Sequence, residues 1–383
     1  MRVVMLSTSA SHHPSPRGRW LPLARAATAQ GIDVIFLGLH PQYHALQAHI
    51  TYEAGLTIQH VAQMHVDAAG PLRGVRLYWT SLWAVFRLAK CAISFRPNVI
   101  CLCKPQPING LAAIIVQRWC GARLILDVDD DEADSHEFAS MVQRLIVTWA
   151  ECTIPQHAST ISAASTWLLR RFGTNAIQIP NGLYPDQFVP AIPNTQEFLQ
   201  QRYQLPPRYL LYFGNLAMHS HGVDLLLRAF AASQSPYPLV IAGEGHDRIA
   251  LQLLAEQLGI AARCLWIGQI AHTDIPALLA HAHLSIDPVP NTIAAAARFP
   301  LKICESLAQG VPVITSPVGD RASLVGDDDF LVPAGDSRAL AQLLTKLSRL
   351  EFEATAFKAR VQQLQWKEVG PHWLAHHRLL RDV

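Results

Sequence analysis

The sequence lacks several features that would place it in a specialised class of protein. It has no uncharged apolar stretch of about 18 residues, so no membrane-spanning helix is predicted. The first apolar run, residues 3–6, is too short for a signal peptide and is typical of a strand. Only 16% of the 383 residues are charged and the formal net charge is +2, which argues against a general nucleic-acid-binding protein. These absences indicate a cytoplasmic protein and leave a peripheral membrane contact open.

Cysteine patterns typical of metal or disulfide sites are also missing. The seven cysteines are an odd number, none forms a Cys-x-x-Cys pair, and most lie in apolar segments, so we expect reduced thiols. The eighteen histidines are scattered, which does not favour a metal centre. The polar loop at residues 7–19 has no Gly-x-Gly-x-x-Gly, and this argues against a nicotinamide-dependent enzyme.

Short apolar strands alternate with segments of helical period along the whole chain. This alternation predicts parallel sheets with helices on both faces, and its length predicts an α/β protein of two doubly wound, Rossmann-like domains. We expect strands at 3–6, 34–37, 57–61, 99–102, 124–128, 160–162, 177–179, 209–213, 239–242, 264–267, 284–286 and 312–315. We expect helices at 21–30, 75–95, 138–151, 222–232, 246–258, 273–282, 300–309 and 336–349.

The domain boundary is expected in the stretch from Pro180 to Pro207, which is rich in Pro, Asn and Gly. We place the first domain at residues 1–185 and the second at residues 186–364. Residues 365–383 are expected to form a helix that crosses back to the first domain. Ligands of doubly wound sheets bind beyond the carboxyl ends of the strands, so the site residues should follow strands.

The stretch from Arg298 to Ile314 predicts a short helix, a stop at Gly310 and a buried strand. On a helix, Arg298, Lys302 and Glu305 would share one face. Cations and helix amides can bind phosphate, and a carboxylate can accept hydrogen bonds from ribose hydroxyls, which suggests a nucleoside diphosphate. The alternative interpretation is a solvated face with a Lys302–Glu305 pair.

Several segments in the second half of the chain can be compared with a known family. They are residues 179–188, 212–214, 222–230, 240–245, 265–268 and 298–314. In this order, they resemble the nucleotide-binding half of retaining GT-B glycosyltransferases of the group 1, or family 4, type. The resemblance implies the GT-B fold, with two Rossmann-like domains facing a central cleft, and a metal-independent reaction without a cofactor. It implies transfer of a sugar, with retention, from a nucleotide-diphosphate sugar donor to a glycan or lipid-linked acceptor, as in polysaccharide biosynthesis.

The same resemblance implies roles for individual residues. Glu305 matches the glutamate that holds the nucleotide ribose, and Lys302 lies one turn before it. Ala297 stands where the family has a sugar-binding glutamate. Asn215 and His221 stand where the family has a basic pair, so the resemblance implies that Lys302 and Arg298 neutralise the diphosphate, with His221 as a further candidate. The implied donor site consists of Gly214, Asn215, His221, Gly243, Gly268, Gln269, Arg298, Phe299, Leu301, Lys302 and Glu305.

The first half carries an acidic run, residues 127–132, directly after a predicted strand. This run can bind acceptor hydroxyls or act as a base, it can hold a divalent cation, or it can be a capped and solvated loop. We predict Asp129, Asp130 and Lys302 as catalytic residues. Acceptor-binding residues are predicted from two other loops, and they are Arg17, Arg19 and Lys104.

Three aromatic residues, Trp79, Trp83 and Phe86, have helical spacing and are expected to pack in the core. Two alternatives to an active transferase stay open. The absence of the family's residues at Ala297, Asn215 and His221 would also fit an inactive nucleotide-sugar-binding protein of the same fold. A nucleotide-sugar epimerase of similar architecture is the other alternative.

Overall fold

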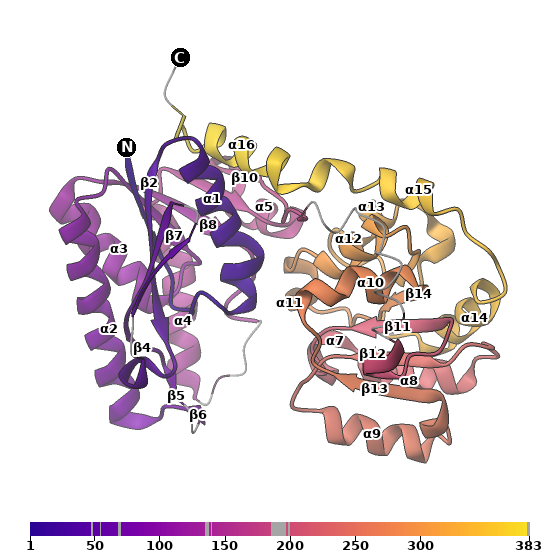
Figure 1. Cartoon of the computed structure of the whole chain (residues 1–383). Coiled ribbons are helices and arrows are strands. Elements are labelled where there is room, and N and C mark those ends of the chain that lie inside the picture. Colours follow the sequence, from indigo (N-terminus) through magenta and orange to yellow (C-terminus); the bar gives the residue numbers. More distant parts are fainter. Residues whose placement is uncertain are drawn as a thin grey trace. The chain divides into compact units, whose positions relative to one another are not determined.

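The computed structural model divides the chain into two compact units (Figure 1). Unit 1 comprises Met1–Gly182 and Trp366–Val383, and unit 2 comprises Leu183–Gln365. The structure describes residues 1–380 except 47–48, 54, 68–69, 135–137, 139, 185–196 and 198–199. Part of the expected boundary stretch and the end of the 179–188 motif lie outside the described residues.

Unit 1 is built on an eight-stranded sheet with the order β10-β9-β8-β7-β1-β2-β4-β3. Every pair of neighbours is parallel except β3 and β4, which are antiparallel. The central strands are buried and apolar, as expected for a parallel sheet covered on both faces. The strands are β1 (Arg2–Leu6), β2 (Asp33–His40), β3 (Ile50–Glu53), β4 (Leu56–Gln63), β7 (Val99–Cys103), β8 (Arg123–Val128), β9 (Thr160–Ala163) and β10 (Ala176–Gln178). A small hairpin, β5 (Val66–Asp67) and β6 (Gly70–Pro71), stands apart from this sheet.

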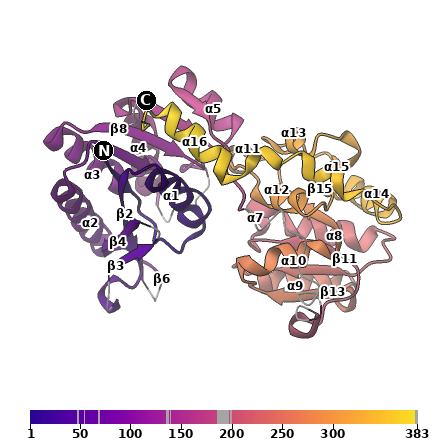
Figure 2. The same ribbon diagram turned by 45° about the horizontal axis from the view of Figure 1, so that its top comes forward.

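The helices of unit 1 form two groups, because right-handed crossovers in opposite directions lead to opposite faces of the sheet. Helix α3 (Pro107–Cys120) lies beside both α2 (Gly74–Phe95) and α4 (Met141–Thr153) (Figure 2). Helix α1 (Leu21–Ala29) lies beside α16 (Trp366–His376), and a Cβ atom on Gly370 would approach Ala26 Cβ to 2.6 Å. A π-helical turn, η1 (Pro16–Trp20), precedes α1, and α5 (Thr166–Phe172) precedes β10.

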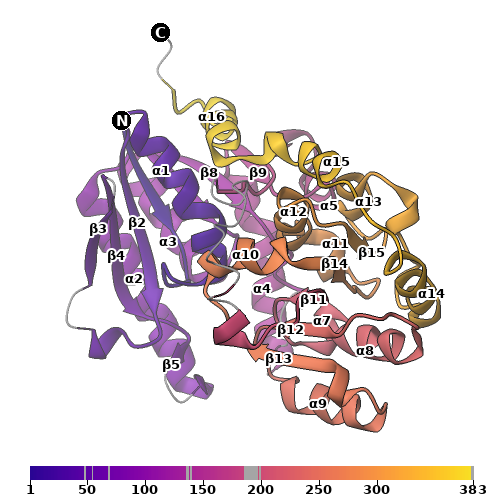
Figure 3. The same cartoon turned by 45° about the vertical axis from the view of Figure 1, so that its right-hand side comes forward.

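Unit 2 is built on a five-stranded parallel sheet with the order β13-β12-β11-β14-β15. The strands are β11 (Tyr209–Phe213), β12 (Leu239–Ala242), β13 (Cys264–Gly268), β14 (Ala282–Asp287) and β15 (Val313–Thr315). Helix α8 (Val223–Ala232) lies beside α9 (Arg248–Gln257) and α14 (Ser337–Leu347), whereas α10 (Ile275–Ala280) lies beside α12 (Leu301–Ala308) (Figure 3). The shorter helices are α7 (Met218–His221), α11 (Ile293–Ala297), α13 (Arg321–Val325) and α15 (Ala354–Ala359).

The two doubly wound units confirm the predicted fold class, and each predicted strand overlaps an observed one. One detail of the prediction is wrong. Arg298 is not on the helix of Lys302 and Glu305, because α12 begins at Leu301 and Arg298 has an extended backbone (φ −79°, ψ 128°). Pro300 explains the late start, since the residue before a proline disfavours the helical conformation. Among the described residues, no helix is both long and apolar enough to cross a membrane.

Candidate functional site

Three glycines bring backbone groups together at the carboxyl edge of the unit 2 sheet. Gly214 follows β11, Gly243 follows β12 and Gly268 ends β13. The amide of Gly243 donates a hydrogen bond to the carbonyl oxygen of Gly268 at 2.7 Å. A Cβ atom on Gly243, whose φ is +137°, would lie 1.8 Å from the carbonyl oxygen of Gly214. Only glycine fits there, so the edge exposes backbone rather than side chains to a ligand.

Lys302 lies in the first turn of α12 and reaches the end of β11. Its ammonium nitrogen is 4.8 Å from the centre of the Tyr212 ring and would be 3.3 Å from a Cβ atom on Gly214. Burial lowers the pKa of Lys302, and the neighbouring Asp287 partly opposes this effect. The side chain as a whole is 22% exposed, but its ammonium nitrogen is buried beside Tyr212 and Asp287.

Asp287 holds this lysine in place from the end of β14. Its Oδ1 is 3.1 Å from Lys302 Nζ and its Oδ2 accepts a hydrogen bond from Arg321 Nε at 2.8 Å. Burial alone would raise the pKa of Asp287, but Lys302 and Arg321 hold it well below its usual range. Arg321 in turn donates to the carbonyl oxygens of Ala295 and Val318. The carboxylate is therefore ionised and fixes two cations next to the glycine edge.

Arg298 and His221 meet beside these cations. Arg298 Nη1 lies 3.4 Å from His221 Nε2, and His221 Nδ1 lies 2.8 Å from the Ser220 hydroxyl. Burial lowers the pKa of His221 to about 3, and Lys302 and Arg298 add to the effect. Without a bound anion, the imidazole of His221 is therefore neutral at neutral pH. It can still orient Arg298.

Glu305 lies one turn after Lys302 and is 6% exposed. Its Oε1 is 3.1 Å from Nε2 of His272, which belongs to the 3-10 helix His272–Asp274 after β13. Lys302 forms an ion pair with Asp287, whereas Glu305 contacts the imidazole of His272. The two side chains therefore have different partners at the same edge of the sheet.

The other predicted donor residues differ in exposure. Asn215 and Gln269 are exposed at the ends of β11 and β13. Phe299 is 5% exposed and supports the start of α12 at Leu301. Ala297, at the end of α11, is fully buried, so its methyl group belongs to the interior.

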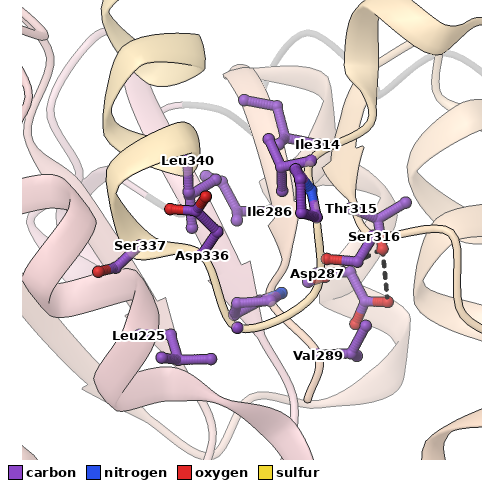
Figure 4. A pocket seen from close by; sticks show the side chains of 14 residues that line it. Leu225, Ile286, Asp287, Val289, Ile314, Thr315, Ser316, Asp336, Ser337 and Leu340 are labelled. Atoms are coloured by element: carbon purple, nitrogen blue, oxygen red, sulfur yellow. Dashed lines mark hydrogen bonds between the residues drawn. The ribbon is translucent and has the colours of Figure 1, made fainter. Parts of the chain in front are cut away.

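A narrow pocket lies beside Asp287, at the carboxyl ends of β14 and β15 (Figure 4). Leu225 of α8 and Leu340 of α14 line one side, and the loop before α14 closes it. The carboxylate of Asp336 caps α14 by accepting hydrogen bonds from the amides of Arg338 and Ala339. None of the predicted donor residues lines this pocket.

Arg19 lies in the interior of unit 1, and this burial contradicts its predicted role in binding the acceptor. Its guanidinium binds both carboxylate oxygens of Asp127, at 2.6 and 2.9 Å. It also donates to the carbonyl oxygen of Ile179 and to Asn181 Oδ1, each at 2.9 Å. The side chain is 1% exposed, so these bonds join the turn after β1 to β8 and to residues 179–181. Arg17, two residues earlier, is exposed.

Lys104 and the acidic run form a second buried cluster at the end of β7 and β8. Lys104 Nζ is 3.3 Å from Asp129 Oδ1 and 3.0 Å from Glu132 Oε1. Burial alone would lower the pKa of Lys104, but Asp129 and Glu132 raise it above its usual value. Burial raises the pKa of Asp129, and Lys104 opposes this. Lys104 therefore lies among carboxylates rather than on an open surface.

The rest of the acidic run packs against α4 and α5. Arg171 of α5 pairs with Asp131 and, at 3.0 Å, with Glu151 of α4. Burial raises the pKa of Glu151 to about 7. Asp130 is half-buried, and its Oδ1 accepts a hydrogen bond from the amide of Asp131 at 3.0 Å. Asp129 and Glu132 are thus the members of the run that contact Lys104, and Asp130 directly follows Asp129.

Sequence reasoning missed three residues of the unit 2 cluster. Asp287 follows a predicted strand directly, and this position was the available signal. Arg321 and His272 lie in short segments without a helical or strand period, so no local pattern marks them.

Comparisons with known proteins agree with this geometry. Residues 195–363 match the family model described as glycosyl transferases group 1. A phosphatidyl-myo-inositol mannosyltransferase from Mycobacterium leprae is 27% identical over 215 residues, which are 55% of this chain and 54% of that protein. The O-antigen chain mannosyltransferase B from Escherichia coli is 26% identical over 203 residues, 50% of this chain and 52% of that protein. The chain thus matches about half the length of these curated relatives.

Solved structures match the chain over almost its full length. Sucrose-phosphate synthase from Thermosynechococcus elongatus has a TM-score of 0.79 and 20% identity, and the match covers 99% of each chain. HepE from Anabaena in complex with UDP has a TM-score of 0.70 and 17% identity, covering 99% of this chain and 100% of that one. These likenesses show the GT-B fold.

Proposed function

From the match of residues 195–363 to glycosyl transferases group 1, we propose that this protein is a retaining glycosyltransferase. It takes a sugar from a nucleotide-diphosphate donor and transfers it to a glycan or lipid-linked acceptor. The mannosyltransferase relatives and the UDP-bound structural neighbour support a donor of this class.

The observation that carries the proposal is the charge cluster at the glycine edge of unit 2. Lys302 and Arg321 pair with one carboxylate, Asp287, and Arg298 lies beside them against His221. Lys302 and Arg298 therefore lie next to the open backbone of the glycine edge. A diphosphate has the opposite charge and accepts charge-assisted hydrogen bonds from Lys302 and Arg298.

The same cluster suits the departure of a diphosphate. In the transfer, the acceptor oxygen bonds to the anomeric carbon while the bond from that carbon to the diphosphate oxygen breaks. The acceptor proton passes to the departing phosphate, on the face where the diphosphate leaves. Lys302 and Arg298 stabilise the charge that develops on the leaving group. Glu305 accepts hydrogen bonds from the ribose hydroxyls.

Acceptor binding is assigned to unit 1. Asp129 and Asp130 are proposed to contact the acceptor hydroxyl, and Lys104 holds Asp129 in place. The exposed Arg17 is proposed as a further acceptor-binding residue. Arg19 is removed from this set, since its guanidinium is already bonded to the interior of unit 1.

A thermal-shift panel of UDP, GDP, ADP and their sugars tests donor binding. The melting temperature should rise with one nucleotide and its sugar, and Lys302→Met should remove most of the rise. Lys346→Met is the matched control, because Lys346 is 57% exposed and pairs with Asp329 in unit 2. A panel without any stabilising nucleotide would reject the proposed donor site.

Turnover with acceptors then separates an enzyme from a binding protein. We expect transfer to one acceptor class, an unchanged anomeric configuration by NMR, and full activity in EDTA. Nucleotide binding without sugar preference or transfer would instead favour the inactive protein. Loss of activity in EDTA that manganese restores would contradict the metal-independent reaction.

A further inference from the structure

Helix α2 of unit 1 has two apolar faces, and only one of them is covered. The face toward the sheet carries small residues such as Ala84, Ala89 and Ala92, together with Leu88. The opposite face carries larger side chains at the positions i, i+3, i+4, i+7, i+8 and i+11. These residues are Val75, Tyr78, Trp79, Leu82, Trp83 and Phe86.

The exposure of this second face corrects the expectation that its aromatics pack in the core. Trp79 is 72% exposed, Trp83 51% and Phe86 54%. A helix that is apolar all round is normally buried in a core or in lipid. The spacing of the three aromatics was helical as predicted, but the alanines take the inner side, because small residues let the helix approach the sheet closely.

The two neighbouring helices continue this surface. On α3, Leu111, Ile115 and Trp119 stand one turn apart, and Trp119 is 76% exposed. On α4, the exposed apolar residues are Met141, Val142, Leu145, Ile146 and Trp149. Since α3 lies beside both α2 and α4, the three helices present one broad apolar face, which we call the aromatic face. Contiguous apolar surface of this extent marks an interaction site.

Basic charges predominate on the aromatic face. The sequence has no aspartate or glutamate between Asp67 and Asp127, so α2 and α3 carry only basic charged residues. Lys90 and Arg118 are exposed and form no ion pair with any described residue. Glu151, the one acidic residue of α4, is buried and pairs with Arg171. Arg76 and Arg144 are exposed beside Asp67 and Asp134.

We propose that the aromatic face binds the surface of an anionic lipid membrane. Tryptophan and tyrosine favour the boundary between lipid headgroups and acyl chains, where the ring is apolar and the polar tip stays hydrated. Basic side chains among them are attracted by anionic headgroups. A second copy of the chain fits less well, because a two-fold contact would bring two predominantly basic faces together. The chain would lie on the membrane, consistent with the absence of a spanning helix among the described residues.

Vesicle sedimentation tests the proposal independently of any enzymatic activity. We expect the full-length protein to pellet with vesicles that contain phosphatidylglycerol and to bind phosphatidylcholine vesicles much more weakly. Trp79→Ser/Trp83→Ser should weaken binding roughly tenfold or more, because two large apolar side chains no longer enter the lipid. Lys90→Glu/Arg118→Glu should reduce binding chiefly to the anionic vesicles, and high salt should do the same.

The matched control is Ile249→Ser/Leu253→Ser on α9 of unit 2, where both side chains are exposed to a similar degree (73% and 51%). This variant should bind like the wild type. Tryptophan quenching by brominated lipids should accompany binding in the wild type and fall in the Trp79→Ser/Trp83→Ser protein. Equal loss in the control variant, or no binding to any vesicle, would overturn the proposal. So would a concentration-dependent dimer in sedimentation velocity that Trp79→Ser/Trp83→Ser abolishes.

Discussion

Replacing Lys302 by methionine should weaken binding of a nucleoside diphosphate far more than binding of the nucleoside. Methionine keeps an unbranched stem against the Tyr212 ring, 4.8 Å from the ammonium in the wild type, and removes only the charge. A hydrogen bond from a charged group contributes about 1.5–3 kcal/mol, which corresponds to a loss of roughly 10- to 150-fold in affinity. Because Asp287 already takes part of the charge at 3.1 Å, we expect the lower half of that range.

The same substitution should cost little stability. Asp287 keeps Arg321 at 2.8 Å after Lys302 is lost, so it does not become an isolated buried charge. The destabilisation should therefore stay below the roughly 3–5 kcal/mol that follows when a buried ion pair loses its only partner. Urea denaturation of the two proteins measures this difference and shows whether the fold is intact.

Isothermal titration calorimetry with nucleoside, monophosphate and diphosphate is the decisive assay. The loss of affinity should grow from almost none for the nucleoside to its full value for the diphosphate. Lys346→Met should leave all three affinities unchanged. An equal loss for all three ligands with Lys302→Met would refute the phosphate role and assign Lys302 to packing alone.

Three further predictions address other residues. Glu305→Gln should weaken nucleoside binding by about 1.5–3 kcal/mol, whereas Glu256→Gln on the exposed side of α9 should not, and unchanged affinity in calorimetry would reject the ribose role. Asp129→Asn and Asp130→Asn should lower kcat more than they raise the donor KM, and intact rates would make the acidic run a structural loop. Above pH 6.5, His221 is neutral in both the folded and the unfolded chain. Its folded pKa of about 3 means that only the unfolded chain takes up a proton as the pH falls below 6.5, and this proton uptake destabilises the folded wild type. The free energy of unfolding of the wild type, relative to that of His221→Gln, should therefore fall by about 2 kcal/mol between pH 7.5 and pH 5. A constant gap in urea denaturation would show that His221 is protonated equally in both states.

Sequence patterns predicted most of the strands, because the strands of parallel sheets are short apolar runs. The predicted and observed bounds of β11 and β12 coincide, and those of the other predicted strands overlap. The edge strand β3 was missed, since its four residues are all exposed and have no buried pattern. Helix α3 was missed too, although its uniformly apolar sequence between two strands required a crossover.

The candidate site was harder to predict from the sequence, because its residues contact side chains from distant segments of the chain. Lys302 and Glu305 could be picked from their spacing, but their partners Asp287 and His272 lie 15 and 33 residues away. The burial of polar side chains could not be predicted from the local sequence either. Arg19 looked like a surface cation in a polar loop, yet Asp127, 108 residues further on, holds it inside the unit.

The position of α16 has a consequence for the way the chain matures. Residues 366–376 complete unit 1 by covering α1, and His377, which follows them, places its ring nitrogens 2.7 Å from Thr160 Oγ1 and 3.0 Å from Ser162 Oγ. During synthesis the first 182 residues are therefore made before α16, and unit 1 stays incomplete until all of unit 2 has been translated. Until then Ala26 and the hydroxyls of β9 face water, so a nascent or prematurely terminated chain exposes a surface that chaperones and proteases can recognise.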